Sequence, residues 1–131
     1  MHPETHKWEK KLKLMFDAID DFLENKYGKT YPLHPSRPDR GTTSNKEHDG
    51  LFNVGATFTT GMGSEFGSGY VIEVRMLTLS HVPDDLQKTI EQEVVSLIDE
   101  KLPQVFPGKD LKVVRDGSVY KIYGDLGLGE L

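Results

Sequence analysis

A polar segment at positions 34–49 carries the side chains best suited to hold an anion. Guanidinium groups bind carboxylate and phosphate through parallel N–H donors, and hydroxyl, amide and imidazole groups can add further polar contacts. The candidate ligand-binding residues of this segment are Arg37, Arg40, Thr42, Asn45, His48 and Asp49. Positions 26–49 hold five Lys or Arg and three Asp or Glu, a net charge of +2 in a chain of net charge −5. The segment therefore predicts a small-anion site, with an ordinary solvated loop as the alternative.

A glycine-rich stretch at positions 61–69 is the second candidate. Its four glycines in nine residues let backbone N–H groups converge on a ligand, because no Cβ intervenes. The candidate residues here are Gly61, Gly63, Ser64 and Phe66. A strand pattern follows the last glycine, so the stretch is neither a Walker loop nor a dinucleotide fingerprint. The alternative is the flexible tip of a hairpin.

No residue spacing predicts a metal site or a nucleophile. The potential metal ligands lack helical i, i+4 and His-x-His spacing; they are His34, His48, Asp49, His81, Asp84 and Asp85. The loop serines Ser44, Ser64 and Ser68 do not stand in a Gly-x-Ser-x-Gly elbow. The chain has no cysteine, which excludes disulfides, thiolate metal sites and a thiol nucleophile. We therefore expect neither a metal nor a cofactor.

Periodic apolar residues predict two helices that would position these loops. In the first, over 8–27, they recur three and four apart, at Trp8, Leu12, Met15, Phe16, Ile19, Phe22 and Leu23. The second is expected from Pro83 to Leu102, and Pro103 is expected to end it. The acidic pair Asp20-Asp21 is interpreted as solvated, and Asp84-Asp85 as favourable charges in the first turn of the second helix.

Alternating apolar and polar residues predict four strands in two hairpins. The first hairpin joins strands near 52–59 and 70–77, and the second joins 111–115 to 119–123. Asp116-Gly117 predicts a type I′ turn. Positions 29–50 contain three X-Pro dipeptides and indicate a long ordered loop. The glycine-rich tail at 124–131 is expected either to fray or to dock a leucine.

These elements predict a single α+β domain over residues 1–131 with the order αββαββ. A four-stranded antiparallel sheet with both long amphipathic helices packed on one face would bury each apolar stripe. The open face would then carry Asn53, Gly55, Thr57, Thr59, Val71, Glu73, Arg75, Leu77 and Leu79. A partly apolar open face indicates either a homodimer or a ligand cleft.

Composition excludes several classes of protein. No run of 18 apolar residues is present, and the first residues lack the basic and apolar regions of a signal peptide. We therefore expect a soluble cytoplasmic protein that has no contact with membranes. The 16 Lys plus Arg and 21 Asp plus Glu argue against a general nucleic-acid binder, which needs massed positive charge.

The leading hypothesis is a small, non-enzymatic binding or assembly module that forms a homodimer. It would hold a small anionic ligand or a protein partner near loops 34–49 and 61–69. These loops are expected at opposite ends of the first strand, so they can form one site only if the long loop folds back along the sheet or if dimer symmetry brings them together. One alternative is an enzyme acting on a phosphorylated or carboxylated metabolite, with Arg37 and Arg40 as the anion clamp and His48 or Asp49 as the acid–base group. A second alternative is an RNA-binding module.

Overall fold

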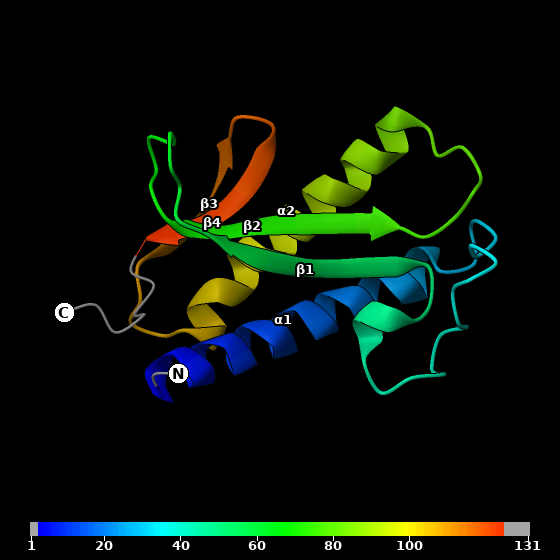
Figure 1. Ribbon diagram of the computed structural model, residues 1–131, viewed down its shortest axis with the longest axis horizontal. Helices are drawn as coiled ribbons and strands as arrows, with labels where there is room; N and C mark the ends of the chain where they lie inside the picture. The colour runs from blue at the N-terminus through cyan, green and yellow to red at the C-terminus, as the bar shows by residue number, and fades with distance from the viewer. Residues whose placement is uncertain (1–2, 125–131) are drawn as a thin grey trace.

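The computed structural model describes residues 3–124, which form two α-helices, one short 3-10 helix and four strands (Figure 1). In chain order the elements are α1 (Pro3–Tyr27), η1 (Lys46–His48), β1 (Phe52–Thr59), β2 (Gly69–Met76), α2 (Asp84–Val105), β3 (Leu111–Asp116) and β4 (Val119–Gly124). The long elements follow the predicted order αββαββ. The prediction for the tail concerns residues 125–131, which lie outside the described part of the chain.

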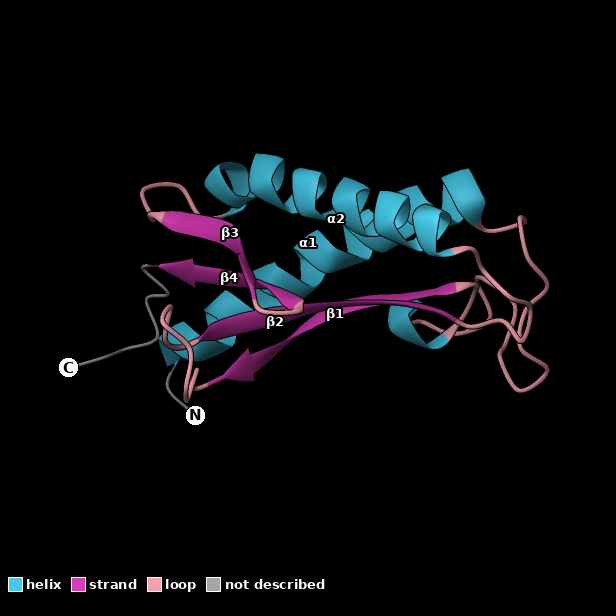
Figure 2. Cartoon of the chain, turned by 90° about the horizontal axis from the view of Figure 1, so that it is seen from above, coloured by secondary structure: helices cyan, strands magenta, loops and turns pink. Residues whose placement is uncertain are grey.

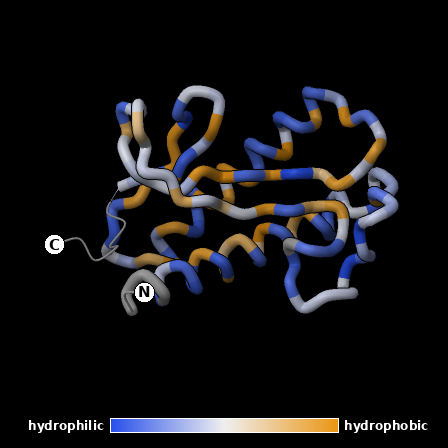
Figure 3. Tube along the Cα trace, viewed as in Figure 1, coloured by the Kyte–Doolittle hydropathy of each residue, from blue (hydrophilic) through white to orange (hydrophobic). Residues whose placement is uncertain are grey.

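The elements are arranged in two layers. The strands form one antiparallel sheet in the order β1-β2-β4-β3, and Figure 2 shows both helices on one face of it. This confirms the predicted α+β architecture. Hydrophobic positions recur along both helices and the strands (Figure 3). Between the layers the side chains of Ile19, Phe52, Ile98 and Ile122 are fully buried, so sheet and helices share one core.

Helix α1 buries a stripe that is rotated slightly from the predicted one. Phe22 is 39% exposed, whereas Asp20 is 0% exposed. Asp20 follows Phe16 by four residues and therefore shares its face of the helix. The interpretation of Asp20 as a solvated residue is wrong for this reason. The helix also begins at Pro3, before the predicted start, because apolar periodicity marks only the turns that contact the core.

Helix α2 continues past the proline that was expected to end it. Pro103 lies in the last turn, and the helix ends at Val105. The missing N–H of a proline removes one backbone hydrogen bond, but the next turn is still closed because Phe106 N–H donates to Leu102 O at 2.8 Å. The Phe106 ring stacks on Trp8 of α1 with centroids 4.1 Å apart, and this packing compensates for the interruption.

The turn between β3 and β4 differs from the predicted type. Asp116 lies opposite Val119, so the two-residue loop is Gly117-Ser118. A type I′ turn needs positive φ at both loop residues. Here Gly117 has φ +66°, and none of the described non-glycine residues has positive φ. This sign pattern is that of a type II′ turn, in which glycine takes the first loop position.

The two hairpins are joined by a very short ladder. All of β1, from Phe52 to Thr59, pairs with β2, whereas β4 pairs with β2 only at Tyr70 and Val71. Figure 1 shows β3 and β4 diverging from the rest of β2. Within residues 3–124, therefore, no strand pairs with the second edge of β2 from position 72 to position 76.

Candidate functional site

Arg37 fastens the 34–50 loop to the start of β1. Its Nε donates to Gly50 O at 2.8 Å, and its Nη2 donates to Asp49 O at 3.0 Å and to Phe52 O at 2.9 Å. Backbone carbonyls in such a position would otherwise lack donors. Arg37 therefore directs its fork of donors into the protein and holds the end of the loop in place.

Arg40 lies within a group of carboxylates. Its Nη1 is 2.8 Å from Asp20 Oδ1 and 3.4 Å from Asp49 Oδ1, and its Nη2 donates to Asp21 Oδ1 at 2.7 Å. Nη1 also donates to Lys46 O at 3.0 Å. These carboxylates neutralise the positive charge of Arg40, which was predicted to bind an external anion. The structure places Arg37 and Arg40 close together, but both guanidinium groups donate to carbonyl and carboxylate groups of the protein itself.

Asp49 organises the turn that precedes η1. Its Oδ2 accepts from Gly41 N–H at 3.1 Å, from Thr43 N–H at 2.9 Å and from Thr43 Oγ1 at 3.3 Å. Burial alone would raise the pKa of the Asp49 carboxyl, but the Thr43 and Gly41 hydrogen bonds and the Arg40 charge hold that pKa below its usual value. Asp49 is thus a fixed acceptor and is poorly suited to move a proton at neutral pH.

Asp20 is the unusual member of this cluster. Neither of its carboxylate oxygens has an aligned hydrogen-bond donor among the described residues, although the Arg40 charge lies nearby. Burial raises the pKa of Asp20 from 3.8 to about 7, and attraction to Arg40 opposes the shift without cancelling it. Glu24, one turn further along α1, instead accepts from Leu51 N–H at 2.8 Å and from Phe52 N–H at 3.2 Å.

The remaining loop candidates have separate environments. Asn45 accepts from Lys13 Nζ at 3.2 Å through its side chain, which ties the loop to α1. Thr42 is exposed, and its N–H donates to Asp39 O at 3.1 Å. His48 is exposed at the end of η1. The loop is therefore ordered, as predicted, by contacts that run mostly to α1 and to the start of β1.

The glycine-rich loop is fastened down at the other end of the β1–β2 hairpin. Lys121 is only 1% exposed, and its Nζ lies 2.7 Å from Asp116 Oδ2. The same Nζ donates to Ser64 Oγ at 3.1 Å and to Gly67 O at 2.6 Å. Phe66 packs edge-on against Tyr123 with centroids 5.1 Å apart. One buried lysine thus joins this loop to the β3–β4 hairpin.

Gly61 is a position of this loop that has no room for a side chain. A Cβ added at Gly61 would lie 1.8 Å from the carbonyl oxygen of Gly67, and Gly61 has φ +76°. Gly63 also has positive φ, but a Cβ there would meet nothing. Figure 1 shows loops 34–50 and 61–69 at opposite ends of β1. Within one chain the structure does not bring the two groups of candidates together.

Replacing Lys121 by methionine should lower the free energy of unfolding by about 1–3 kcal/mol, because Asp116 and Ser64 lose their shared cationic donor. Urea denaturation at neutral pH measures this change. Lys112→Met on exposed β3 is the matched control and should change the free energy by less than about 0.5 kcal/mol. Equal effects of the two substitutions would show that the Lys121 contacts do not hold the loop.

A cleft beside the 34–50 loop has a different character. It has a volume of about 460 Å³ and is lined by His34, Ser36, Arg37, Pro38, His48, Arg75 and Leu77. His34 N–H donates to Leu77 O at 2.7 Å, which holds the loop against the end of β2. Four of the lining residues are basic types, and none of the lining residues that the structure describes is acidic.

Arg75 is a charged cleft residue that was not among the ligand-binding candidates from the sequence. It is exposed on β2, and no described residue forms a hydrogen bond or ion pair with its guanidinium. Strand alternation placed Arg75 and Leu77 on the open sheet face, but their proximity to His34 depends on how the loop folds back. Of the ten candidate residues only Arg37 and His48 line this cleft. A basic residue on the open face near the end of a strand was the available signal.

Other groupings in the described residues carry less chemistry. A second cleft of about 490 Å³ lies over the Arg40 cluster, but its lining pairs Asp21, Glu24 and Asp49 with Lys29, Arg40 and Lys46. Among the described residues no three His, Cys, Asp or Glu side chains are grouped to hold a metal ion. No helix within residues 3–124 is long and apolar enough to cross a membrane.

Comparison with known proteins places the chain in a family. Residues 3–124 match the model of a family described as "Uncharacterised protein", and the chain belongs to that family. A protein of Borreliella burgdorferi, described as "Uncharacterized protein", is 46% identical to this chain over 106 residues. The matched region covers 81% of this chain and 83% of the relative. No solved structure matches the chain.

Proposed function

We propose that the protein is a cytoplasmic binding module that holds a small organic anion in the cleft between the 34–50 loop and the end of β2. The observation that carries this proposal is the guanidinium of Arg75, which has no partner among the described residues and lines the cleft together with His34 and His48. A free guanidinium recognises carboxylate or phosphate through two N–H donors, and the neighbouring imidazoles add donors from the loop. Leu77 and Pro38 supply apolar surface for the rest of the ligand.

The geometry favours binding over the enzymatic alternative. An enzyme built on Arg37 and Arg40 needs both guanidinium groups to face a substrate, but they are hydrogen bonded to carbonyls and carboxylates of the protein. His34 contributes a defined donor, because its Nδ1 accepts from Ser36 N–H at 3.1 Å and leaves Nε2 to carry the proton. The cleft therefore offers oriented donors, whereas both arginines of the enzymatic alternative are engaged by groups of the protein itself.

Titration of the ¹⁵N-labelled full chain with inorganic phosphate, followed by NMR, tests this proposal. We expect saturable shifts at His48, Arg75 and Leu77. Arg75→Ala should weaken binding by about tenfold, since a charge-assisted bidentate contact is lost. Arg115→Ala removes an equal charge from β3, where the arginine donates to Gly117 O, and should leave the affinity within about twofold.

His48→Ala supplies a second arm of the test, because it changes the loop side of the cleft without touching β2. It should weaken phosphate binding by a few fold while the shifts at Arg75 persist. Shifts that do not saturate, or equal affinities in Arg75→Ala and Arg115→Ala, would contradict a built anion site.

A further inference from the structure

The uncovered edge of β2 presents backbone hydrogen-bonding groups in a regular pattern. Leu77 N–H donates to Leu51 O, on the β1 side of the strand. Because successive residues of a strand point their N–H and C=O groups to opposite edges, Ile72, Val74 and Met76 direct theirs to the other edge. The described part of the chain supplies a strand there only at Tyr70 and Val71, where β4 pairs.

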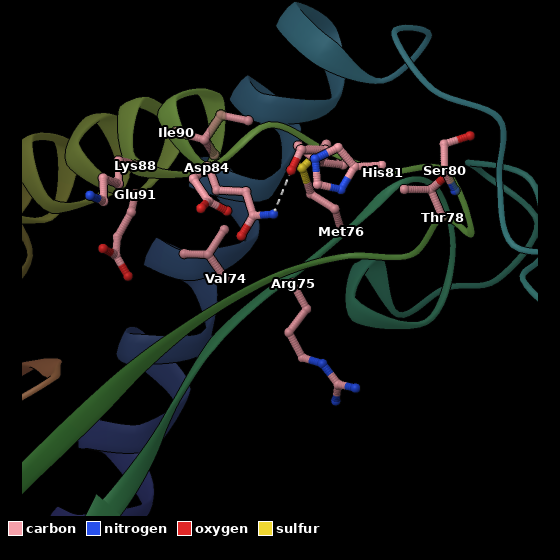
Figure 4. Close-up of a pocket in the computed structure, with 12 residues that line it drawn as sticks. Val74, Arg75, Met76, Thr78, Ser80, His81, Asp84, Lys88, Ile90 and Glu91 are labelled. Atoms are coloured by element: carbon pink, nitrogen blue, oxygen red, sulfur yellow. Dashed lines mark hydrogen bonds between the residues drawn. The ribbon is translucent and has the colours of Figure 1, made fainter.

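A groove runs beside this edge. It has a volume of about 570 Å³ and lies between the second half of β2 and the start of α2. Figure 4 shows Val74 and Met76 on the side of β2 that faces Ile90 of α2, whereas Arg75 extends from the opposite side of the strand. A strand laid along the edge would therefore find apolar contacts toward the helix and charged neighbours on the open face.

The residues along the edge are complementary to themselves. Positions 72–76 read Ile-Glu-Val-Arg-Met. When two copies of this segment pair antiparallel about Val74, Ile72 of one faces Met76 of the other and Glu73 of one faces Arg75 of the other. The residues with outward backbone groups then face each other, so the register also satisfies the hydrogen bonds of the ladder. Three apolar pairs, one of them Val74 with its own copy, and two opposite-charge pairs result from the same symmetry.

Neither charge has an opposite charge across its own hairpin. Glu73 lies opposite Gly55 and Arg75 lies opposite Asn53 on β1. Both side chains are exposed. Natural sheets usually protect an exposed edge with proline, a bulge or charged side chains. Positions 72–76 contain no proline and pair regularly with β1, and their one acidic and one basic side chain attract each other when two copies pair antiparallel.

We infer that β2 is a docking surface for a second copy of this chain, which pairs antiparallel with it over residues 72–76. The paired hairpins form one continuous sheet across the dimer, with the order β1-β2-β2-β1 at its centre. In this register Met76 of the second copy lies opposite Ile72, and β2 of the second copy ends there. The next residue of the first copy, Val71, already pairs with β4, so the two partners of β2 do not overlap. The inference does not rest on the proposed anion site, but it uses the same arginine. The Arg75 guanidinium that faces Glu73 of the second copy also lines the cleft, so the second copy and an anion compete for it.

A charge-swap experiment on the full chain tests this register. Sedimentation equilibrium of the wild type should give a concentration-dependent dimer of the 14.8 kDa chain. Glu73→Arg or Arg75→Glu each places two like-charged pairs across the interface and should raise the dimer dissociation constant by about tenfold or more. The double variant E73R/R75E restores two opposite-charge pairs and should return the constant to within about threefold of the wild type.

Each outcome supports or overturns the interface. A wild type that remains monomeric at millimolar concentration overturns it, and so does a dimer that survives both single reversals. A double variant that is no better than the single ones shows that Glu73 and Arg75 do not face each other. Phosphate titration of E73R separates this inference from the proposed function, because the monomeric variant keeps every residue of the cleft.

Discussion

Replacement of Asp20 by asparagine should raise the free energy of unfolding at pH 8 by up to about 4 kcal/mol and leave it nearly unchanged at pH 4. The pKa of Asp20 is about 7 in the folded chain, against 3.8 for an ordinary aspartate. A raised carboxyl pKa means that the folded state binds more protons than the unfolded state between these values. Stability is therefore lost as the pH rises from about 4 through 7, and asparagine removes that loss because it cannot ionise.

Urea denaturation of both proteins at intervals from pH 4 to pH 8 measures the difference. Asp21 and Asp49, whose pKa values are lowered, contribute the opposite slope, but they are present in both proteins and cancel in the comparison. Asp39→Asn, on the exposed part of the loop, is the matched control and should give a difference that does not depend on pH. A pH-independent difference for Asp20→Asn as well would show that Asp20 ionises normally.

Replacement of Arg40 by alanine should lower the free energy of unfolding at pH 8 by about 3–5 kcal/mol, because buried carboxylates are left without their cation. Asp20 and Asp49 are both nearly inaccessible, and Arg40 is within 3.4 Å of each. Chemical denaturation of the single variant and of R40A/D20N gives the coupling. The loss of unfolding free energy should be smaller in the D20N background, since only one of the two buried carboxylates is charged there.

Arg115→Ala serves as the control for this measurement, because Arg115 is exposed and its guanidinium lies over the half-buried Tyr120 ring at 5.4 Å without contacting a buried carboxylate among the described residues. It should change the free energy of unfolding by less than about 0.5 kcal/mol. Additivity of Arg40→Ala and Asp20→Asn would contradict a direct coupling between the two groups.

Periodicity in the sequence was sufficient to predict the elements and their layers. The spacing of Trp8, Leu12 and Ile19 identifies a helical face, and alternation through β1 and β2 identifies a hairpin with one buried side. The order of strands was not accessible, because joining β2 to β4 depends on contacts between residues some fifty positions apart. Local patterns report local geometry and carry no such information.

The chemistry of the 34–50 loop was harder to predict, because the residue types that bind an anion also bind an internal carboxylate. Arg40 was predicted to hold an external anion, but its counterions come from α1, where Asp20 was taken to be solvated. Only the packing of the loop against α1 distinguishes the two roles. Arg75 was not predicted to lie beside the loop for the related reason that its neighbours in the cleft are distant in sequence.

The contacts that hold the 34–50 loop also limit which insertions and deletions this protein can accept in evolution. Surface loops usually accept insertions and deletions because their backbone makes few obligatory contacts. Here Arg37 and Arg40 must reach fixed carbonyls and carboxylates, and Glu24 must reach the first two amides at the start of β1. One residue added between Arg37 and Asp49 would move a charge out of its buried place. The longest loop in the described chain is therefore closely restricted in length, and changes in chain length are expected at open turns such as the one at Gly108.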